Sequence, residues 1–314
     1  MKIPRNLLFV AASVLLGCGG PASSDVNVPI APLASAPAPA RKYTVRLHRE
    51  SHVGDKTRAV IDDDKQQHVV TRLLGAPPEK SDKKTHSHLV GTMVVREIGD
   101  RKDARRTEIT VTELWQTVDG GARTVLAPPG ARLAIARAAR KEDAQVTVDD
   151  KPAPNELRET IDDLLTLTTG GPSDDEIFGS AVPQPIGAEW SPNIALAKKD
   201  MGEKGIVARP GGLSGKVKLV GTEQANGVDC LDVQADLDVD GIQSIGDLPA
   251  GSSILSGGVS AHMRGLFPVD EKLGRMGEEM DVVTRAKMRV PSPKGDVEVD
   301  VKTVDRRTAT YMPL

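Results

Sequence analysis

The chain is poor in aromatic residues, which make up only 2% of its 314 residues. With two Trp, two Tyr and three Phe, its apolar core has to be built from Val, Leu, Ile and Ala. Cysteine is equally scarce, since Cys18 and Cys230 are the only two. Stability must therefore come from burying apolar surface, and 39% hydrophobic residues suffice for one large domain or two small ones.

A strong charge of one sign is also missing. Lys and Arg number 41 and Asp and Glu number 44, which gives a net charge of −3 at pH 7 with His neutral. A charge this mild and this evenly mixed does not provide the basic surface that nucleic-acid binding requires. We therefore expect no nucleic-acid partner.

Complete catalytic motifs are absent from the sequence. It contains no Gly-x-Ser-x-Gly nucleophile elbow. The stretch from Gly211 to Lys216 looks like the end of a phosphate-binding loop, but Pro210 stands where the first Gly belongs and Val217 replaces the magnesium-binding Ser or Thr. We expect no cofactor and no catalytic residue; the alternative is an enzyme whose site is assembled from distant residues.

The first 18 residues have the layout of an exported protein's leader. Lys2 and Arg5 precede an apolar run from Leu7 to Leu16 that is too short to span a bilayer as a helix. The run ends in Leu15-Leu16-Gly17-Cys18. This tetrapeptide resembles the lipobox of bacterial lipoproteins. The resemblance implies that Cys18 is acylated, by palmitate among other chains, and becomes the N-terminus of the mature, membrane-anchored protein.

We expect residues 19–41 to form a flexible, Pro/Ala-rich tether. They alternate Pro with small residues and cannot bury enough apolar surface to fold. Gly19, rather than Asp, follows the cysteine. In the sorting pattern of such lipoproteins this implies the periplasmic face of the outer membrane. Loss of Lys2 and Arg5 leaves 39 basic and 44 acidic residues, a net charge of −5, and acylation of Cys18 leaves Cys230 unpaired as a structural thiol.

The rest of the chain is dominated by alternating apolar and polar residues, the pattern of half-buried strands. Short connections between these runs favour an antiparallel arrangement over βαβ units. We expect two β-rich halves, residues 42–170 and residues 171–314. The expected strands are Lys42–Arg49, Gln67–Leu74, His86–Ile98, Arg106–Val118, Thr124–Ala127, Ala131–Ala138, Lys216–Thr222, Val228–Val239, Val259–Phe267, Asp281–Val290 and Asp296–Val304.

Two helices are expected among the strands. Leu157, Ile161, Leu164 and Leu165 form one apolar stripe, which predicts a packing helix over residues 155–169. A weaker helix starts with Ser191 as its cap, with Pro at the first helical position, and runs to about residue 201.

Turn residues predict which strands pair. Asp119-Gly120-Gly121 and Asn226-Gly227 each predict a β-hairpin, since these residues tolerate positive φ. In the second hairpin, Leu231, Val233, Ala235, Leu237 and Val239 should form the buried face. The last two strands should pair with unlike charges on one face and Met288 opposite Val297 on the other. The expected charged pairs are Arg289 with Asp296, Lys287 with Glu298 and Arg285 with Asp300.

Two stretches have features of metal sites. Asp236, Asp238, Asp240 and Asp247, with Gly241, resemble an EF-hand calcium loop. Gln243 departs from that pattern, however, and the preceding run reads as a strand, which favours a solvated strand face ending in a turn. His86 and His88 share one face of a strand, as in a zinc or copper site, but lack a third ligand at diagnostic spacing, which favours surface histidines.

The two tryptophans read as core residues. Trp115 lies on an expected strand, and Trp190 follows the Pro183-to-Glu189 stretch. With its strands, central helix and final meander, the body of the chain resembles uncharacterised β-rich bacterial lipoproteins. Its expected architecture is similar to that of the half-barrel lipoprotein carriers, in which a concave sheet covered by a helix holds acyl chains.

We therefore expect a mainly β (α+β) fold of antiparallel curved sheets with a central packing helix. The expected function is that of a membrane-anchored, non-catalytic module that binds an apolar ligand or a protein partner. An apolar ligand requires a cavity lined by Val, Leu, Ile and Met between the helix and the sheet. The alternative is a structural or envelope-assembly lipoprotein without a small-molecule ligand.

Overall fold

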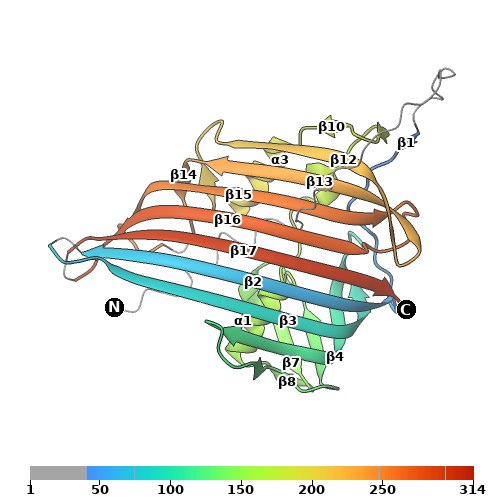
Figure 1. Cartoon of the computed structure of the whole chain (residues 1–314), viewed down its shortest axis with the longest axis horizontal. Coiled ribbons are helices and arrows are strands. Elements are labelled where there is room, and N and C mark those ends of the chain that lie inside the picture. Colours follow the sequence, from blue (N-terminus) through green and yellow to red (C-terminus); the bar gives the residue numbers. More distant parts are fainter. Residues whose placement is uncertain (1–40, 74, 247, 294) are drawn as a thin grey trace, which may run out of the picture.

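The structure, a computed structural model, describes residues 41–314 except positions 74, 247 and 294. One antiparallel sheet of 13 strands organises them (Figure 1). In spatial order its strands are β10 (Glu189–Trp190), β12 (Leu213–Ala225), β13 (Val228–Asp240), β15 (Ser253–Pro268), β16 (Gly277–Val290), β17 (Val297–Pro313), β2 (Lys56–Leu73), β3 (Glu79–Ile98), β4 (Ala104–Val118), β6 (Arg132–Ala136), β7 (Gln145–Val148) and β8 (Lys151–Pro152), with β5 (Thr124–Val125) paired to β4.

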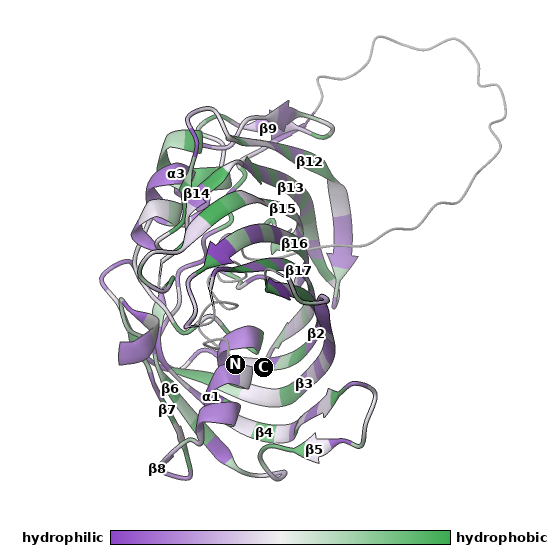
Figure 2. Ribbon diagram, turned by 90° about the vertical axis from the view of Figure 1, so that its left-hand side faces the viewer, coloured by the Kyte–Doolittle hydropathy of each residue, from purple (hydrophilic) through white to green (hydrophobic). Residues whose placement is uncertain are grey.

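The sheet is strongly curved and open, and its helices lie on the concave side (Figure 2). The predicted mainly β fold with curved antiparallel strands and a packing helix is confirmed. The two halves expected from the sequence share this sheet, because β17 pairs with β2 along its whole length, from Val297 opposite Leu73 to Pro313 opposite Thr57. Two small ladders lie outside it: β1 (Lys42–Tyr43) with β9 (Gln184–Pro185), and β11 (Val207–Ala208) with β14 (Ile242–Ser244).

The beginning of the described chain departs from the prediction. The strand expected at Lys42–Arg49 is only two residues long, although Val45 and Leu47 are buried as the alternation predicts. The backbone amides of Leu47 and His48 donate to the carboxylate of Asp175 instead of to a neighbouring strand. Conversely, β2 begins at Lys56 and β3 at Glu79, both earlier than expected. The added part of β2 has Ala59, Ile61 and Asp63 at its buried positions, whereas the first six residues of β3 are all exposed.

Both predicted hairpins are present. Asp119 and Gly120 have φ of 52° and 70°, and the chain folds back so that Trp115 pairs with Val125. Asn226 and Gly227 have φ of 52° and 78° between β12 and β13. The five residues expected on the buried face of β13 are all at most 5% exposed.

The register expected for the last two strands is wrong by two residues. Lys287 pairs with Asp300 and Met288 with Val299. A shift of two keeps every side chain on its predicted face, and Lys287 Nζ still lies 3.0 Å from Glu298 Oε2 diagonally. The connection is longer than a tight hairpin because Pro291 and Pro293 have no amide hydrogens to continue the ladder.

Among the described residues there are three α-helices and one short 3₁₀ helix, Lys141–Asp143. Helix α1 (Asn155–Leu164) ends before the predicted residue 169, since Leu165 is extended and the Asp162 side chain accepts from the amide of Leu167 at 3.3 Å. Helix α2 (Asp174–Phe178) was not predicted. Helix α3 (Ile194–Glu203) begins after Asn193, whose side chain caps the amide of Leu196, rather than after the expected Ser191.

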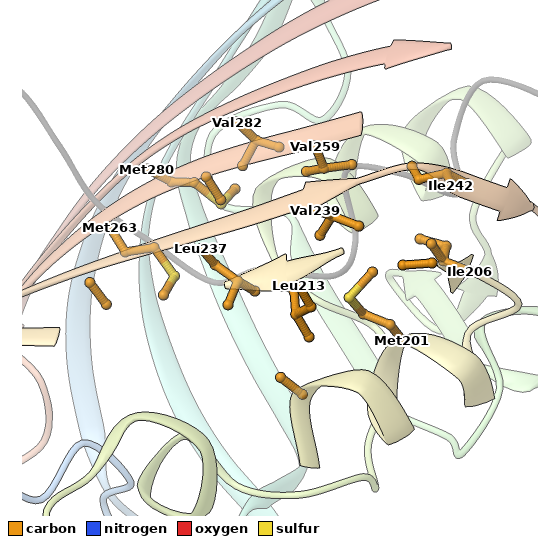
Figure 3. Close-up of a cluster of buried hydrophobic side chains, with 14 of the residues drawn as sticks. Met201, Ile206, Leu213, Leu237, Val239, Ile242, Val259, Met263, Met280 and Val282 are labelled. Atoms are coloured by element: carbon orange, nitrogen blue, oxygen red, sulfur yellow. The ribbon is translucent and has the colours of Figure 1, made fainter. Parts of the chain in front are cut away.

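The concave face holds two apolar clusters. The α3 core packs Ala197 and Met201 of α3 against the second half of the sheet, including Leu237 and Val282 (Figure 3). The α1 core packs Leu157, Ile161 and Leu164 of α1 against the first half. Aliphatic residues and Met dominate both cores, as the shortage of aromatics requires. Within residues 41–314, leaving aside the three positions not described, no helix has the length and apolarity to cross a membrane.

Candidate ligand-binding site

A cavity of about 450 Å³ lies on the concave side, between the two apolar cores. Its wall comes from residues 47–57, 93–107, 164–174 and 274–278, together with Arg137, Arg307 and Tyr311, so both halves of the chain contribute to it. We call it the central cavity. Its wall carries five arginines and four carboxyl groups: Arg49, Arg101, Arg137, Arg275, Arg307, Asp55, Asp103, Asp174 and Glu278.

Glu278 is the buried centre of one side of this wall. Arg275 Nη1 lies 2.6 Å from its Oε2, and Arg307 Nη2 donates to its Oε1. Burial alone would raise the pKa of the Glu278 carboxyl, but the two guanidinium groups hold it below its usual value. The carboxylate therefore stays ionised and forms ion pairs with both arginines.

Asp174, the first residue of α2, also lines the cavity and lies near Arg275 and Glu278. Burial raises the pKa of its carboxyl group, although Arg275 acts in the other direction. The wall of the central cavity carries five arginines against four carboxyl groups.

A second buried polar cluster crosses the concave face on β2, β17 and α1. Lys65 Nζ lies 2.6 Å from Asp163 Oδ1 and 3.5 Å from Asp305 Oδ2. Asp63 is 2% exposed and hydrogen-bonds to Asp305, and burial followed by the nearby Asp305 charge raises the pKa of Asp63 well above its usual value. Three carboxyl groups thus share one ammonium, which favours a proton on Asp63.

The expected aliphatic cavity beneath the helix is not where the sequence placed it. Leu157, Ile161 and Leu164 of α1 are at most 3% exposed and pack directly into the α1 core. The central cavity instead begins at the C-terminal end of α1, where Leu164 and Leu165 line it together with polar residues. The helix uses its apolar face for packing because aliphatic side chains on β2, β3 and β4, among them Ile61, Leu89 and Ile109, belong to the same buried core.

The candidate calcium loop lies on the outer face of β13. Asp236 Oδ1 is 2.6 Å from His262 Nδ1, Asp238 accepts from Ser260 Oγ at 2.6 Å, and Asp240 pairs with Arg209. The first two are ordinary cross-strand contacts to β15. The fourth candidate, Asp247, lies outside the described residues.

His86 and His88 lie on the outer face of β3, and an aromatic residue joins them there. His88 Nδ1 is 2.7 Å from Asp62 Oδ1, and its ring stacks on Trp115 with centroids 4.9 Å apart. The guanidinium of Arg123 covers the Trp115 ring at 4.0 Å. The expectation that Trp115 belongs to the core is therefore wrong: β4 turns it outward while Leu114 faces inward. Trp190 does pack against the α3 core.

In the described part of the chain, no three His, Cys, Asp or Glu side chains are arranged to hold a metal ion. Cys18, the expected acylation site, lies outside the described residues. Cys230 is completely buried, and burial raises the pKa of its thiol, as expected for a structural cysteine.

Sequence reasoning did not find the residues of the central cavity. Arg137, Arg275, Glu278 and Arg307 are distant in sequence and match no motif. One signal was present: Glu278 and Arg307 occupy inward positions of alternating strands whose other inward residues include Met280 and Ala309. A charge at such a position marks a buried ion pair or a functional site.

No protein-family model and no curated protein matches the chain. Among solved structures, lipovitellin, described for its lipid–protein interactions, is 7% identical with a TM-score of 0.38 over 84% of this chain. This chain spans only 25% of the lipovitellin chain. Ail of Yersinia pestis is 7% identical (TM-score 0.12, 82% of this chain and 99% of Ail), and OmpT of Vibrio cholerae is 9% identical (TM-score 0.14, 81% and 99%). Likenesses this low carry no argument about function.

Proposed function

We propose that this protein is a non-catalytic, lipid-anchored binding module of the bacterial cell envelope that holds a small amphiphilic ligand in the central cavity. The cavity itself carries the proposal. Its volume of about 450 Å³ falls within the roughly 300–1,000 Å³ that small-molecule sites occupy. Its wall joins residues from both halves of the chain, as sites between structural units often do.

An amphiphile fits this wall better than a purely apolar ligand. Leu47, Met93, Val95 and Leu165 supply apolar surface, while the arginines and carboxyl groups supply polar contacts. A smaller cavity of about 190 Å³ adjoins, because residues 168–172 line both, and Phe178, Met201 and Leu237 extend its apolar surface. A ligand whose polar group lies in the central cavity can therefore extend its apolar part along the shared wall into the smaller cavity.

Native mass spectrometry of the full chain tests the ligand. We expect wild-type protein, extracted from its membrane and freed of detergent in the spectrometer, to retain a small-molecule mass. Ala104→Trp, which fills the central cavity, should lose that mass by steric exclusion. Ala122→Trp, at an exposed turn, should keep it. A wild-type protein that carries no mass and gains no thermal stability from added amphiphiles contradicts the proposal and favours the alternative, a structural or protein-docking lipoprotein.

Membrane attachment is tested at Cys18. We expect wild-type protein to incorporate labelled palmitate and to fractionate with the outer membrane. Cys18→Ala removes the only thiol of the lipobox-like tetrapeptide, so it should take up no label and accumulate as precursor or leave the outer membrane fraction. Cys230→Ala is the matched control and should behave as wild type. If wild-type protein takes up no label and fractionates with membranes to the same extent as Cys18→Ala does, the proposed lipid anchor is refuted.

A further inference from the structure

One arginine of the central cavity differs from the others in its partners. Arg137 follows β6, and its Nε donates to the carbonyl of Thr166 at 2.9 Å. Its Nη1 donates to the carbonyl of Ala104 at 3.1 Å and to Thr107 Oγ1 at 3.0 Å. All three acceptors are neutral. Among the described residues, no carboxylate lies within the 4.0 Å of an ion pair with Arg137, and none accepts a hydrogen bond from its Nη2.

With one exception, the positive charge of each of the other arginines of the wall is balanced by an ion pair with a carboxylate. Arg275 and Arg307 share Glu278, and Arg101 Nη1 lies 3.1 Å from Glu176 Oε2. The exception is Arg49, which donates from Nη2 to the carbonyl of Pro268 at 2.8 Å, while its Nε and Nη1 are buried without a partner in the described chain. In the described part of the chain, these two guanidinium groups therefore form no direct ion pair. Carboxylates act on them only from a distance, Asp103 on Arg137, and Glu271 and Asp175 on Arg49.

A buried cation without a counter-ion is costly, and arginine cannot remove that cost by losing its proton. Burial lowers the pKa of both Arg137 and Arg49, a sign of the same desolvation, yet a guanidinium stays charged at any physiological pH. The fork of Arg137 is already held at two of its nitrogens by neutral acceptors. Its orientation is thus fixed before any ligand arrives, which lowers the entropy cost of binding.

We propose that the central cavity recognises an anionic group, a carboxylate or a phosphate, through Arg137. This inference rests on the proposed ligand-binding function and specifies its chemistry. The geometry leaves Nη2 of Arg137 as the donor for the anion, and a planar guanidinium matches both carboxylate and phosphate oxygens. The anion supplies the charge that the wall lacks, and the apolar wall residues take the rest of the ligand.

Calorimetry with short amphiphiles tests the inference on the full chain in lipid nanodiscs, with empty nanodiscs as the blank. The probes are hexanoate, hexyl phosphate, hexanol and inorganic phosphate. We expect hexanoate and hexyl phosphate to bind at least about tenfold more tightly than hexanol, because a charge-assisted hydrogen bond replaces a neutral one. Inorganic phosphate distinguishes a free anion from the headgroup of an amphiphile. If it binds as tightly as hexyl phosphate does, the ligand is the free anion. If it binds more weakly, the ligand is an amphiphile with an anionic headgroup.

Variants connect the preference to Arg137. Arg137→Gln should remove the preference for hexanoate over hexanol, and Arg137→Lys should retain part of it. Arg46→Gln, an exposed arginine outside the cavity, should leave the preference unchanged. Because Arg137 also joins three segments of the chain, circular dichroism must show that its variants are folded. If they are not, Arg49→Gln provides the second test and should weaken hexanoate binding.

The outcomes separate this inference from the proposed function. If hexanol binds wild type as tightly as hexanoate does, the proposed recognition of an anionic group is wrong, while the ligand-binding function stands. If no probe of any kind binds and no mass is retained in native spectra, the function itself fails. A charge preference that persists unchanged in folded Arg137→Gln also overturns the assignment to Arg137.

Discussion

Replacing Glu278 by Gln should lower the free energy of unfolding by about 3–5 kcal/mol, the range found when one partner of a buried ion pair is removed. Glu278 is 2% exposed, and it is the ion-pair partner of Arg307, which is 5% exposed. Gln keeps the size of the side chain but not its charge. Arg307 and Arg275 would then lie side by side in the wall of the central cavity with no carboxylate between them.

Urea unfolding followed by circular dichroism measures this loss, with Glu279→Gln as the matched control. Glu279 is the next residue on β16, faces the other side of the sheet and lies 3.5 Å from Arg264. Its replacement should change stability by less than about 1 kcal/mol, because Glu279 is only half-buried and Arg264 keeps Asp232 and Glu223 as partners. Adding Arg307→Met to Glu278→Gln should recover part of the loss, because it removes one uncompensated charge. Equal effects at positions 278 and 279 would disprove the buried pair.

Replacing Asp63 by Asn should stabilise the protein at pH 8, because a neutral amide needs no bound proton in this buried site and is not repelled by the Asp305 charge. Oδ1 of Asp63 and Oδ1 of Asp305 have no hydrogen-bond partner in the described chain. Burial, with the Asp305 charge beside it, raises the pKa of Asp63 well above its usual value. The folded state therefore holds a proton that the unfolded state releases at lower pH.

The sign of the pH dependence follows from this raised pKa. The contribution of protonated Asp63 to stability is complete below the unfolded pKa near 4 and is lost as the pH rises through the higher folded pKa. Asn mimics the neutral acid, so the gain from Asp63→Asn should be small at pH 4 and grow towards pH 8. Thermal melts across this pH range measure it, with Asp64→Asn, exposed and facing outward, as the control. A gain that does not change with pH would show that Asp63 carries no shared proton.

Local sequence was sufficient where a few neighbouring residues decide the geometry. Asn226-Gly227 predicted its hairpin because both residues accept the positive φ that the turn requires. The stripe on α1 predicted which of its residues are buried, since helical periodicity alone puts them on one face. The register of β16 and β17 was missed by two residues because the prediction relied on charge pairing. In the structure Arg285 lies opposite Lys302, a like-charge pair that pairing rules alone would reject.

The central cavity could not be predicted in this way. Its four defining residues, Arg137, Arg275, Glu278 and Arg307, come from the segment after β6, the β15–β16 connection, β16 and β17. No spacing along the chain relates them. The outward position of Trp115 was missed for a similar reason: a tryptophan suits either face of a strand, and the partners that hold it, His88 and Arg123, lie on a neighbouring strand and beyond a turn.

The sequence by itself determined the alternation, the turns and the aliphatic composition, and with them a mainly β protein built of antiparallel curved strands around a packing helix. Those properties depend on residues within a few positions of one another. Only the tertiary structure decided that β17 closes onto β2, so that one sheet unites both halves and a charged cavity opens between two apolar cores. Such pairings join segments more than 200 residues apart, and their energy comes from contacts that exist only once the sheet is complete.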